Sequence, residues 1–268
     1  MAVTALHTAA TGLNALSTQV DVIANNLANV NTTAFKGQRV NFEDMLYQEK
    51  AQPGVENANG DQRPAGIFVG LGVRIANTDF DFAQGSPIET DQPLDLMIDG
   101  NGFFAVDIIE NEGSGIGFTR AGNFFVNSDG EIVLGNSDGP RLEPPITIPA
   151  DAVTVEITSD GNVEVLQAGN ALPTNVGQIQ LTSFVNPKGL RPLGANIFVE
   201  SDASGPPIEA APGTDGVGTL VQGFLESSNV DPVTELVDLI KAQRAFELNS
   251  QSIQAADQAL QVVANLRR

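Results

Sequence analysis

Both ends of this 268-residue chain carry an apolar residue at nearly every seventh position, and this repeat constrains the fold more than any other feature. At the front, one heptad position holds Leu6, Leu13, Val20 and Leu27, and the second holds Ala9, Leu16, Ile23 and Val30. At the back, the two positions hold Leu239, Phe246, Ile253 and Leu260, and Ala242, Asn249, Ala256 and Val263. A seven-residue period gives a helix one narrow apolar seam, which needs a partner helix. The partners are the two ends of one chain or the ends of neighbouring chains.

The limits of both helices can be predicted from local signals. The first helix is expected from about residue 3 to about residue 29, where a run of Asn and Thr follows. The second is expected to begin with Asp231 as cap and Pro232 at its first position, and to run to the chain end. Asn249 lies in the second seam, where it is either tolerated at an exposed edge or fixes the register of pairing.

The middle of the chain is typical of antiparallel β structure. Short apolar runs alternate with Asp-Gly pairs, which favour the positive φ of tight hairpins, at Asp99, Asp129, Asp138 and Asp160. We therefore predict an α+β protein in which the terminal helices form a coiled-coil-like module beside a central all-antiparallel β domain. The expected divisions are residues 1–34 for the first helix, 35–74 for a Gly/Pro-rich extended connection, 75–203 for the β domain, 204–225 for a linker and 226–268 for the second helix.

Composition excludes several classes of function. The net charge is −20, and residues 75–187 hold 17 acidic residues against only two basic ones, Arg120 and Arg141. Such a surface repels nucleic acid and anionic lipid, so we expect no nucleic-acid binding and no membrane insertion. The chain has no Cys, so disulfide and thiolate chemistry are impossible. Residues 1–7 lack the basic and apolar regions of a signal peptide, so no cleaved secretory signal is expected.

The sequence offers little chemistry. His7, the single histidine, has no acidic neighbour in its helix. The run 127–131 resembles the start of a calcium loop but lacks the later ligands, so a hairpin turn is the better interpretation. The Gly70-Leu71-Gly72 run is followed by no helix, which excludes a dinucleotide fingerprint. No spacing singles out a carboxylate pair for glycan hydrolysis. We expect no catalytic residue, no metal and no cofactor, with a cell-wall glycan hydrolase or a membrane-active helical protein as remote alternatives.

Two terminal motifs resemble those of the bacterial flagellar rod and hook axial proteins. They are the run 25–36, which reads NNLANVNTTAFK, and the run 223–231, which reads GFLESSNVD and continues into KAQRAFE at 241–247. The residues that carry this resemblance are Asn25, Asn26, Leu27, Asn29, Asn31, Thr32, Phe35, Lys36, Ser228, Asn229, Val230 and Asp231. The runs 93–96, 102–104 and 119–124 resemble the middle β domain of the same family. Within it, the chain length and the run 182–190 look most like a distal rod protein.

The resemblance implies a structural function without catalysis. Family members are exported unfolded by the flagellar type III apparatus and polymerise into a hollow helical tube, in which paired terminal helices line the core. It implies a homo-oligomer that contacts proximal rod and hook proteins and turns inside the P- and L-ring bushing proteins, in the basal body. The stretch 47–74 would contact neighbouring subunits and keep the shaft straight. A proximal rod or short hook-type paralogue is the nearest alternative. The expected assembly seam comprises Leu6, Leu13, Leu16, Val20, Ile23, Leu27, Val30, Leu239, Phe246, Asn249, Ile253, Leu260 and Val263.

Overall fold

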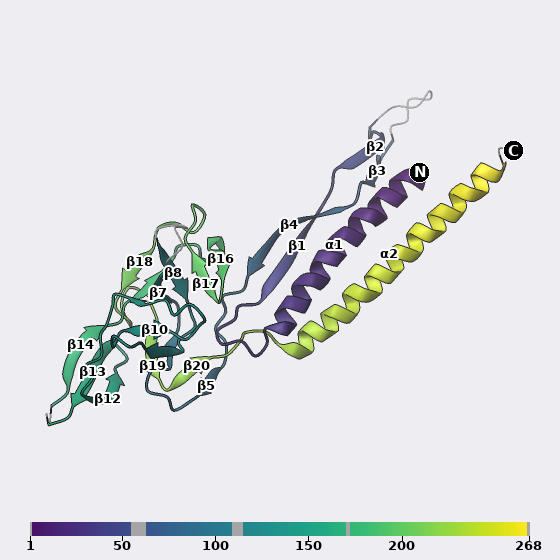
Figure 1. The fold of residues 1–268 in the computed structure, drawn as a ribbon. Coiled ribbons are helices and arrows are strands. Elements are labelled where there is room, and N and C mark those ends of the chain that lie inside the picture. The colour runs from purple at the N-terminus through teal and green to yellow at the C-terminus, as the bar shows by residue number, and fades with distance from the viewer. Residues whose placement is uncertain (1, 55–62, 109–114, 170–171, 267–268) are drawn as a thin grey trace. The chain divides into compact units, whose positions relative to one another are not determined.

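The computed structural model describes residues 2–54, 63–108, 115–169 and 172–266 (Figure 1). The chain forms two compact units, and each is assembled from segments that are far apart in the sequence. Unit 1 comprises Met1–Ala28, Gln38–Phe80 and Asp231–Arg268, and unit 2 comprises Asn29–Gly37 and Asp81–Val230. Two long terminal helices with antiparallel strands between them confirm the predicted α+β class.

In unit 1 the two helices, α1 (Ala2–Ala28) and α2 (Pro232–Leu266), lie side by side and run in opposite directions (Figure 1). Two contacts define their register. A Cβ atom on Gly12 would lie 3.0 Å from the Asn249 side-chain nitrogen, and Asn26 donates a hydrogen bond to Glu235. The Asn249 side chain therefore lies against Gly12, and two polar side chains meet at Asn26 and Glu235.

The start of α2 follows the predicted capping pattern. The Asp231 carboxylate accepts the Val233 N–H at 3.1 Å and the Thr234 hydroxyl at 2.6 Å, ahead of Pro232 as the first helical residue. The Thr234 hydrogen bond is the main reason that the pKa of Asp231 is lowered. These bonds satisfy donors that a helix start would otherwise leave unpaired.

Unit 1 also contains a β arm, which we define as strands β1 to β4 (Figure 1). Strand β1 (Gln38–Asp44) pairs with β4 (Val73–Phe80), and β2 (Tyr47–Ala51) pairs with β3 (Ile67–Gly70), all antiparallel. Strands β1 and β4 pack along α1. Gly72 permits this approach, because a Cβ atom there would fall within 2.2 Å of the Thr11 hydroxyl, and its φ is 121°. Within the period-less stretch 48–72, the described residues of β2 and β3 are therefore paired.

The strands of unit 2 are short, and every pairing among them is antiparallel. They are β5 (Pro87–Glu89), β6 (Leu96–Asp99), β7 (Phe103–Asp107), β8 (Ile116–Thr119), β9 (Phe124–Val126), β10 (Ile132–Leu134), β11 (Leu142–Glu143), β12 (Ala152–Ile157), β13 (Asn162–Gln167), β14 (Thr174–Gln178), β15 (Leu181–Ser183), β16 (Arg191–Gly194), β17 (Ile197–Val199), β18 (Ile208–Ala210), β19 (Thr219–Gln222) and β20 (Phe224–Glu226). A 3-10 turn, η1, spans Pro187–Gly189.

The largest sheet of unit 2 has the order β16-β17-β8-β7-β15-β18, with β11 also paired to β7. Residues 103–106 of β7 are all buried, as expected for a strand at the centre of a sheet. Phe104 contacts Phe124 edge-to-face, with ring centroids 5.1 Å apart. A second sheet, β12-β13-β14, adds Val163 and Val165 to the same core.

Two expectations about the middle region have different outcomes. The Asp-Gly turns are confirmed at Gly130 and Gly161, whose φ values are 84° and 83°. The expected linker at 204–225 is wrong, because β18 in this stretch pairs with β15, and β19 pairs with β6. Leu220 is only 3% exposed and joins the core. The few apolar residues that anchor this stretch stand between Gly and Pro residues, which conceal the strand pattern.

Candidate functional site: helix seam, exposed apolar faces and terminal clasp

Most of the expected seam residues are at least partly buried in unit 1. Ile23 is 5% exposed, and the α1 residues Leu6, Leu13, Leu16, Val20 and Leu27 are partly buried. On α2 the partly buried members are Leu239, Asn249, Ile253 and Leu260. Phe246 differs, since it is 41% exposed, and Val30 lies in the turn after α1. The side chain of Val263 lies outside the described residues.

Both units leave large apolar side chains exposed, and those of unit 1 gather on two of its elements. On α2 they are Val233, Leu236, Val237, Ile240, Phe246, Leu248 and Val262. On the β arm they are Phe42, Leu46, Tyr47, Ile67 and Phe68. The run Val233, Leu236, Val237 and Ile240 follows helical spacing, so it forms a second apolar face, which we call the α2 outer face. The predicted seam did not include this face, although the spacing of its residues is visible in the sequence.

Asn26, from the first motif, fastens unit 1 internally. Its side chain is 2% exposed and forms a pair of hydrogen bonds with the backbone of Gln38, donating to the carbonyl at 2.9 Å and accepting from the N–H at 2.9 Å. The same amide nitrogen donates to Glu235 Oε1 at 3.0 Å. Burial raises the pKa of Glu235, and the Asn26 bond offsets only part of that rise. One amide thus joins the end of α1, the start of β1 and the first turn of α2.

Three other motif residues, Phe35, Lys36 and Asn229, meet inside unit 2, in a set of contacts between residues 34–37 and 226–229 that we call the terminal clasp. Ala34 N–H donates to the Glu226 carbonyl at 2.8 Å, and Asn229 N–H donates to the Phe35 carbonyl at 3.2 Å. The Asn229 side chain accepts the Gly37 N–H at 2.8 Å and donates to the Asp81 carbonyl at 2.6 Å. The two motifs, almost two hundred residues apart in sequence, therefore close one β unit.

A buried ionic cluster lies at the centre of the terminal clasp. The Lys36 ammonium lies 2.5 Å from Glu226 Oε1, and the Arg120 Nε lies 2.9 Å from Glu226 Oε2. The side chains of Lys36 and Glu226 are fully buried, and that of Arg120 is 4% exposed. The N–H of Gly85 also donates to Glu226 Oε1, at 2.8 Å. Sequence reasoning named Lys36 but missed Arg120 and Glu226, because nothing local to either residue indicates their contact.

Other motif residues have smaller local roles. The Ser228 hydroxyl accepts the Val230 N–H at 3.3 Å, and both residues are buried. The Thr32 hydroxyl donates to the Asn29 side chain at 3.1 Å. Asn25 and Asn31 are exposed. Most of the motif thus stabilises the fold of the chain and leaves few side chains facing outward.

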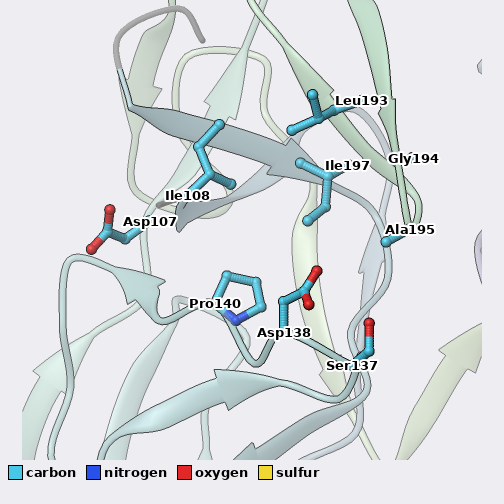
Figure 2. A pocket seen from close by; sticks show the side chains of 9 residues that line it. All are labelled: Asp107, Ile108, Ser137, Asp138, Pro140, Leu193, Gly194, Ala195 and Ile197. Atoms are coloured by element: carbon cyan, nitrogen blue, oxygen red, sulfur yellow. The ribbon is translucent and has the colours of Figure 1, made fainter. Parts of the chain in front are cut away.

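Unit 2 has a surface cavity of about 760 Å³, whose walls come from β7, β16 and β17 and the loop 137–140 (Figure 2). Its lining is mostly apolar, with Ile108, Pro140 and Ile197 among the walls. Figure 2 shows the carboxylate of Asp138 beside Ile197, whereas that of Asp107 points away. Ser137 adds one hydroxyl to the described lining, but that lining contains no His, Cys, Lys or Arg to activate it or to stabilise a developing charge.

The other candidate chemical sites take part in structural bonds. The His7 ring lies 3.2 Å from the Leu71 carbonyl within unit 1. In the calcium-like run, the Asn127 side chain accepts the N–H groups of Asp129 and Glu131, and Glu131 pairs with Arg141 at 3.2 Å. Within residues 2–54, 63–108, 115–169 and 172–266, no group of three or more His, Cys, Asp or Glu is placed to hold a metal ion. No helix in that same part of the chain is long and apolar enough to cross a membrane.

Three family descriptions match successive parts of the chain. "Flagella basal body rod protein" matches residues 6–36, "Flagellar hook protein FlgE/F/G D1 domain" matches 97–165, and "Flagellar basal body rod FlgEFG protein C-terminal" matches 221–266. The chain is 45% identical to the flagellar basal-body rod protein FlgG of Caulobacter vibrioides, over 98% of this chain and 99% of the relative. It is 41% identical to FlgG of Borreliella burgdorferi over 98% of both chains. It is 31% identical to the flagellar hook-basal body complex protein FlhP of Bacillus subtilis over 97% and 98%.

Proposed function

This chain belongs to the flagellar basal-body rod protein family and is a structural subunit of the distal rod, and we propose that it polymerises there through its helices and its β arm. It is not an enzyme, and it works in the basal body of the flagellum, where it assembles with other basal-body components. The proposal concerns which surfaces hold one subunit to the next.

The observation that carries the proposal is the α2 outer face. The pairing of α1 with α2 covers only one face of α2. On the α2 outer face, the exposed fractions of Val233, Leu236, Val237 and Ile240 are 46–68%. Burying the exposed part of such side chains contributes about 1 kcal/mol each, so four of them contribute roughly 4 kcal/mol per subunit contact. A contiguous apolar face of this kind is typical of a protein interface. We assign it to contact with helices of neighbouring subunits, in a coiled-coil-like core.

The β arm supports a second contact. Leu46 is 84% exposed and Tyr47 is 59% exposed, although Tyr47 is paired within β2 and Leu46 directly precedes it. Ile67 and Phe68 on the opposite strand are also more than half exposed. We propose that this surface packs on an adjacent subunit and resists bending of the shaft, as the resemblance to distal rod proteins implies for the stretch 47–74.

We further propose that a head-to-tail contact of this kind, which does not close on itself, gives a helical tube that transmits torque. Its ends would contact proximal rod and hook proteins, its outside would face the P- and L-ring bushing proteins, and the chain would reach the site through the flagellar type III export apparatus.

Thiol labelling tests the α2 outer face directly, because the chain has no Cys of its own. In the Val237→Cys variant, the thiol should react readily with a maleimide in the isolated subunit and at least tenfold more slowly in intact rods. Rods dissociated by denaturant before labelling provide the control, since their thiols should react fully. Equal labelling of subunits and intact rods would exclude this face from the interface.

A further inference from the structure

The ionic cluster of the terminal clasp has an unbalanced charge that the assembly function does not explain. Two cations, Lys36 and Arg120, share the single carboxylate of Glu226 in a region without solvent access. Asp81 is the other acid whose charge acts on Lys36. Burial lowers the pKa of Lys36, and the attraction of Glu226 offsets only part of this effect.

The carboxylate joins segments from distant parts of unit 2. Lys36 comes from the stretch 29–37, Arg120 follows β8, and Glu226 ends β20. Arg120 also donates to the Gly100 carbonyl at 2.7 Å, and Lys36 donates to the Ala83 carbonyl at 2.7 Å. The two cations are thus held by backbone carbonyls independently of Glu226, but those carbonyls supply no negative charge.

Removing the acid therefore costs far more than removing one cation. Without Glu226, the Lys36 ammonium and the Arg120 guanidinium would lie in the interior without their buried carboxylate, and only the exposed Asp81 would still attract Lys36. A buried charge without a partner is strongly destabilising. Without Lys36, one Arg–Glu pair of balanced charge remains. This asymmetry follows from the two-to-one charge ratio and would not arise if Glu226 only filled space.

We propose that Glu226 is a charge-dependent latch, whose carboxylate closes unit 2 by seating between the cations of Lys36 and Arg120. When the carboxylate is absent, the segment 223–230 separates from residues 34–37 and 81–86, and the β unit stays open at that edge. The last strand of unit 2 thereby controls whether the first segment of the unit, more than 180 residues earlier, is held in place. The latch acts within a single chain, so it stands or falls independently of the proposed assembly surfaces.

Hydrogen exchange on the full-length chain tests the latch, with mass spectrometry of peptides covering 223–230 and 81–86. In E226Q, which keeps the side-chain size, exchange of the clasp amides should be about 100-fold faster than in the wild type. In K36M, exchange should stay within about threefold of the wild type, because one balanced pair remains. The matched control is E209Q, an exposed glutamate in β18, which should change nothing.

The double variant K36M/E226Q separates the latch from simple packing. Removing one unpaired cation should slow the exchange of E226Q by about tenfold, whereas two independent losses of packing would add and make exchange faster still. Should E226Q fail to fold, recovery of folding in the double variant supports the latch, and failure of both overturns it. Wild-type exchange in E226Q, or a double variant no slower than E226Q, would also overturn it.

Discussion

Replacing Asn26 by aspartate tests the structural role of the first motif with a change of one atom. The Asn26→Asp variant keeps the side-chain size and the oxygen that accepts the Gln38 N–H, but it loses the amide donor that reaches the Gln38 carbonyl at 2.9 Å and Glu235 at 3.0 Å. Each lost hydrogen bond costs about 1 kcal/mol. Repulsion between the new carboxylate and Glu235 lowers the stability by a further 1–2 kcal/mol, roughly. The loss is no larger because one of the two acids can take up a proton, which removes the repulsion. The total loss is about 3–4 kcal/mol.

Thermal unfolding followed by circular dichroism measures this loss in the isolated subunit. Both α-helices belong to unit 1, so the helical signal reports on the unit that contains Asn26. A loss of 3–4 kcal/mol should lower Tm by roughly 6–15 °C at neutral pH. The difference from the wild type should shrink as pH falls, since a protonated acid can donate the missing bond.

The control for this experiment is Asn14→Asp, which adds the same charge at an exposed position of the same helix. Its Tm should stay within about 2 °C of the wild type. If Asn26→Asp and Asn14→Asp unfolded at the same temperature, the Asn26 bonds would not be the fastening that the structure indicates.

Two further substitutions test the helix pair. Gly12→Leu should lower the Tm of unit 1, because even a Cβ atom at this position would lie 3.0 Å from the Asn249 side chain. Adding Asn249→Ala to the same chain should restore most of the lost Tm. An unchanged Tm in Gly12→Leu would refute the register of the two helices. Glu235→Gln should raise the free energy of unfolding at pH 7, because burial raises the pKa of this acid and so disfavours its charged form in the folded state. That gain is present above the raised pKa and should vanish as pH falls below 4.5, the ordinary pKa of a glutamate, which paired urea titrations at neutral and acidic pH would measure.

The local signals in the sequence sufficed for the helices. The heptads and the Asp231 cap predicted α1 and α2 to within a few residues, because both depend on spacing and on neighbours in the chain. The Asp-Gly pairs predicted tight turns for the same reason. Antiparallel packing of α1 against α2 was one of several pairings that the seams allowed, and only the tertiary contacts select it.

The terminal clasp could not be predicted in the same way. Lys36, Arg120 and Glu226 meet only because strands β8 and β20 bring them together, and no periodicity connects positions so far apart. The predicted domains were consecutive stretches of the chain, whereas each compact unit is assembled from segments that are far apart in the sequence. Most residues of the motif that identifies the family make contacts within the chain. The sequence therefore showed the resemblance to the family but not the structural role of each residue.

The central claim is that this chain forms the distal shaft through its helices, and electron microscopy of basal bodies tests it most directly. A strain lacking the gene, or carrying only the Val233→Asp/Val237→Asp variant, should show a proximal rod stub without a hook and should not swim. Restoration by the wild-type gene and by Gln251→Asp, an exposed polar position on the same helix, serves as the control. Complete, straight rods and normal swimming in the double variant would contradict the account.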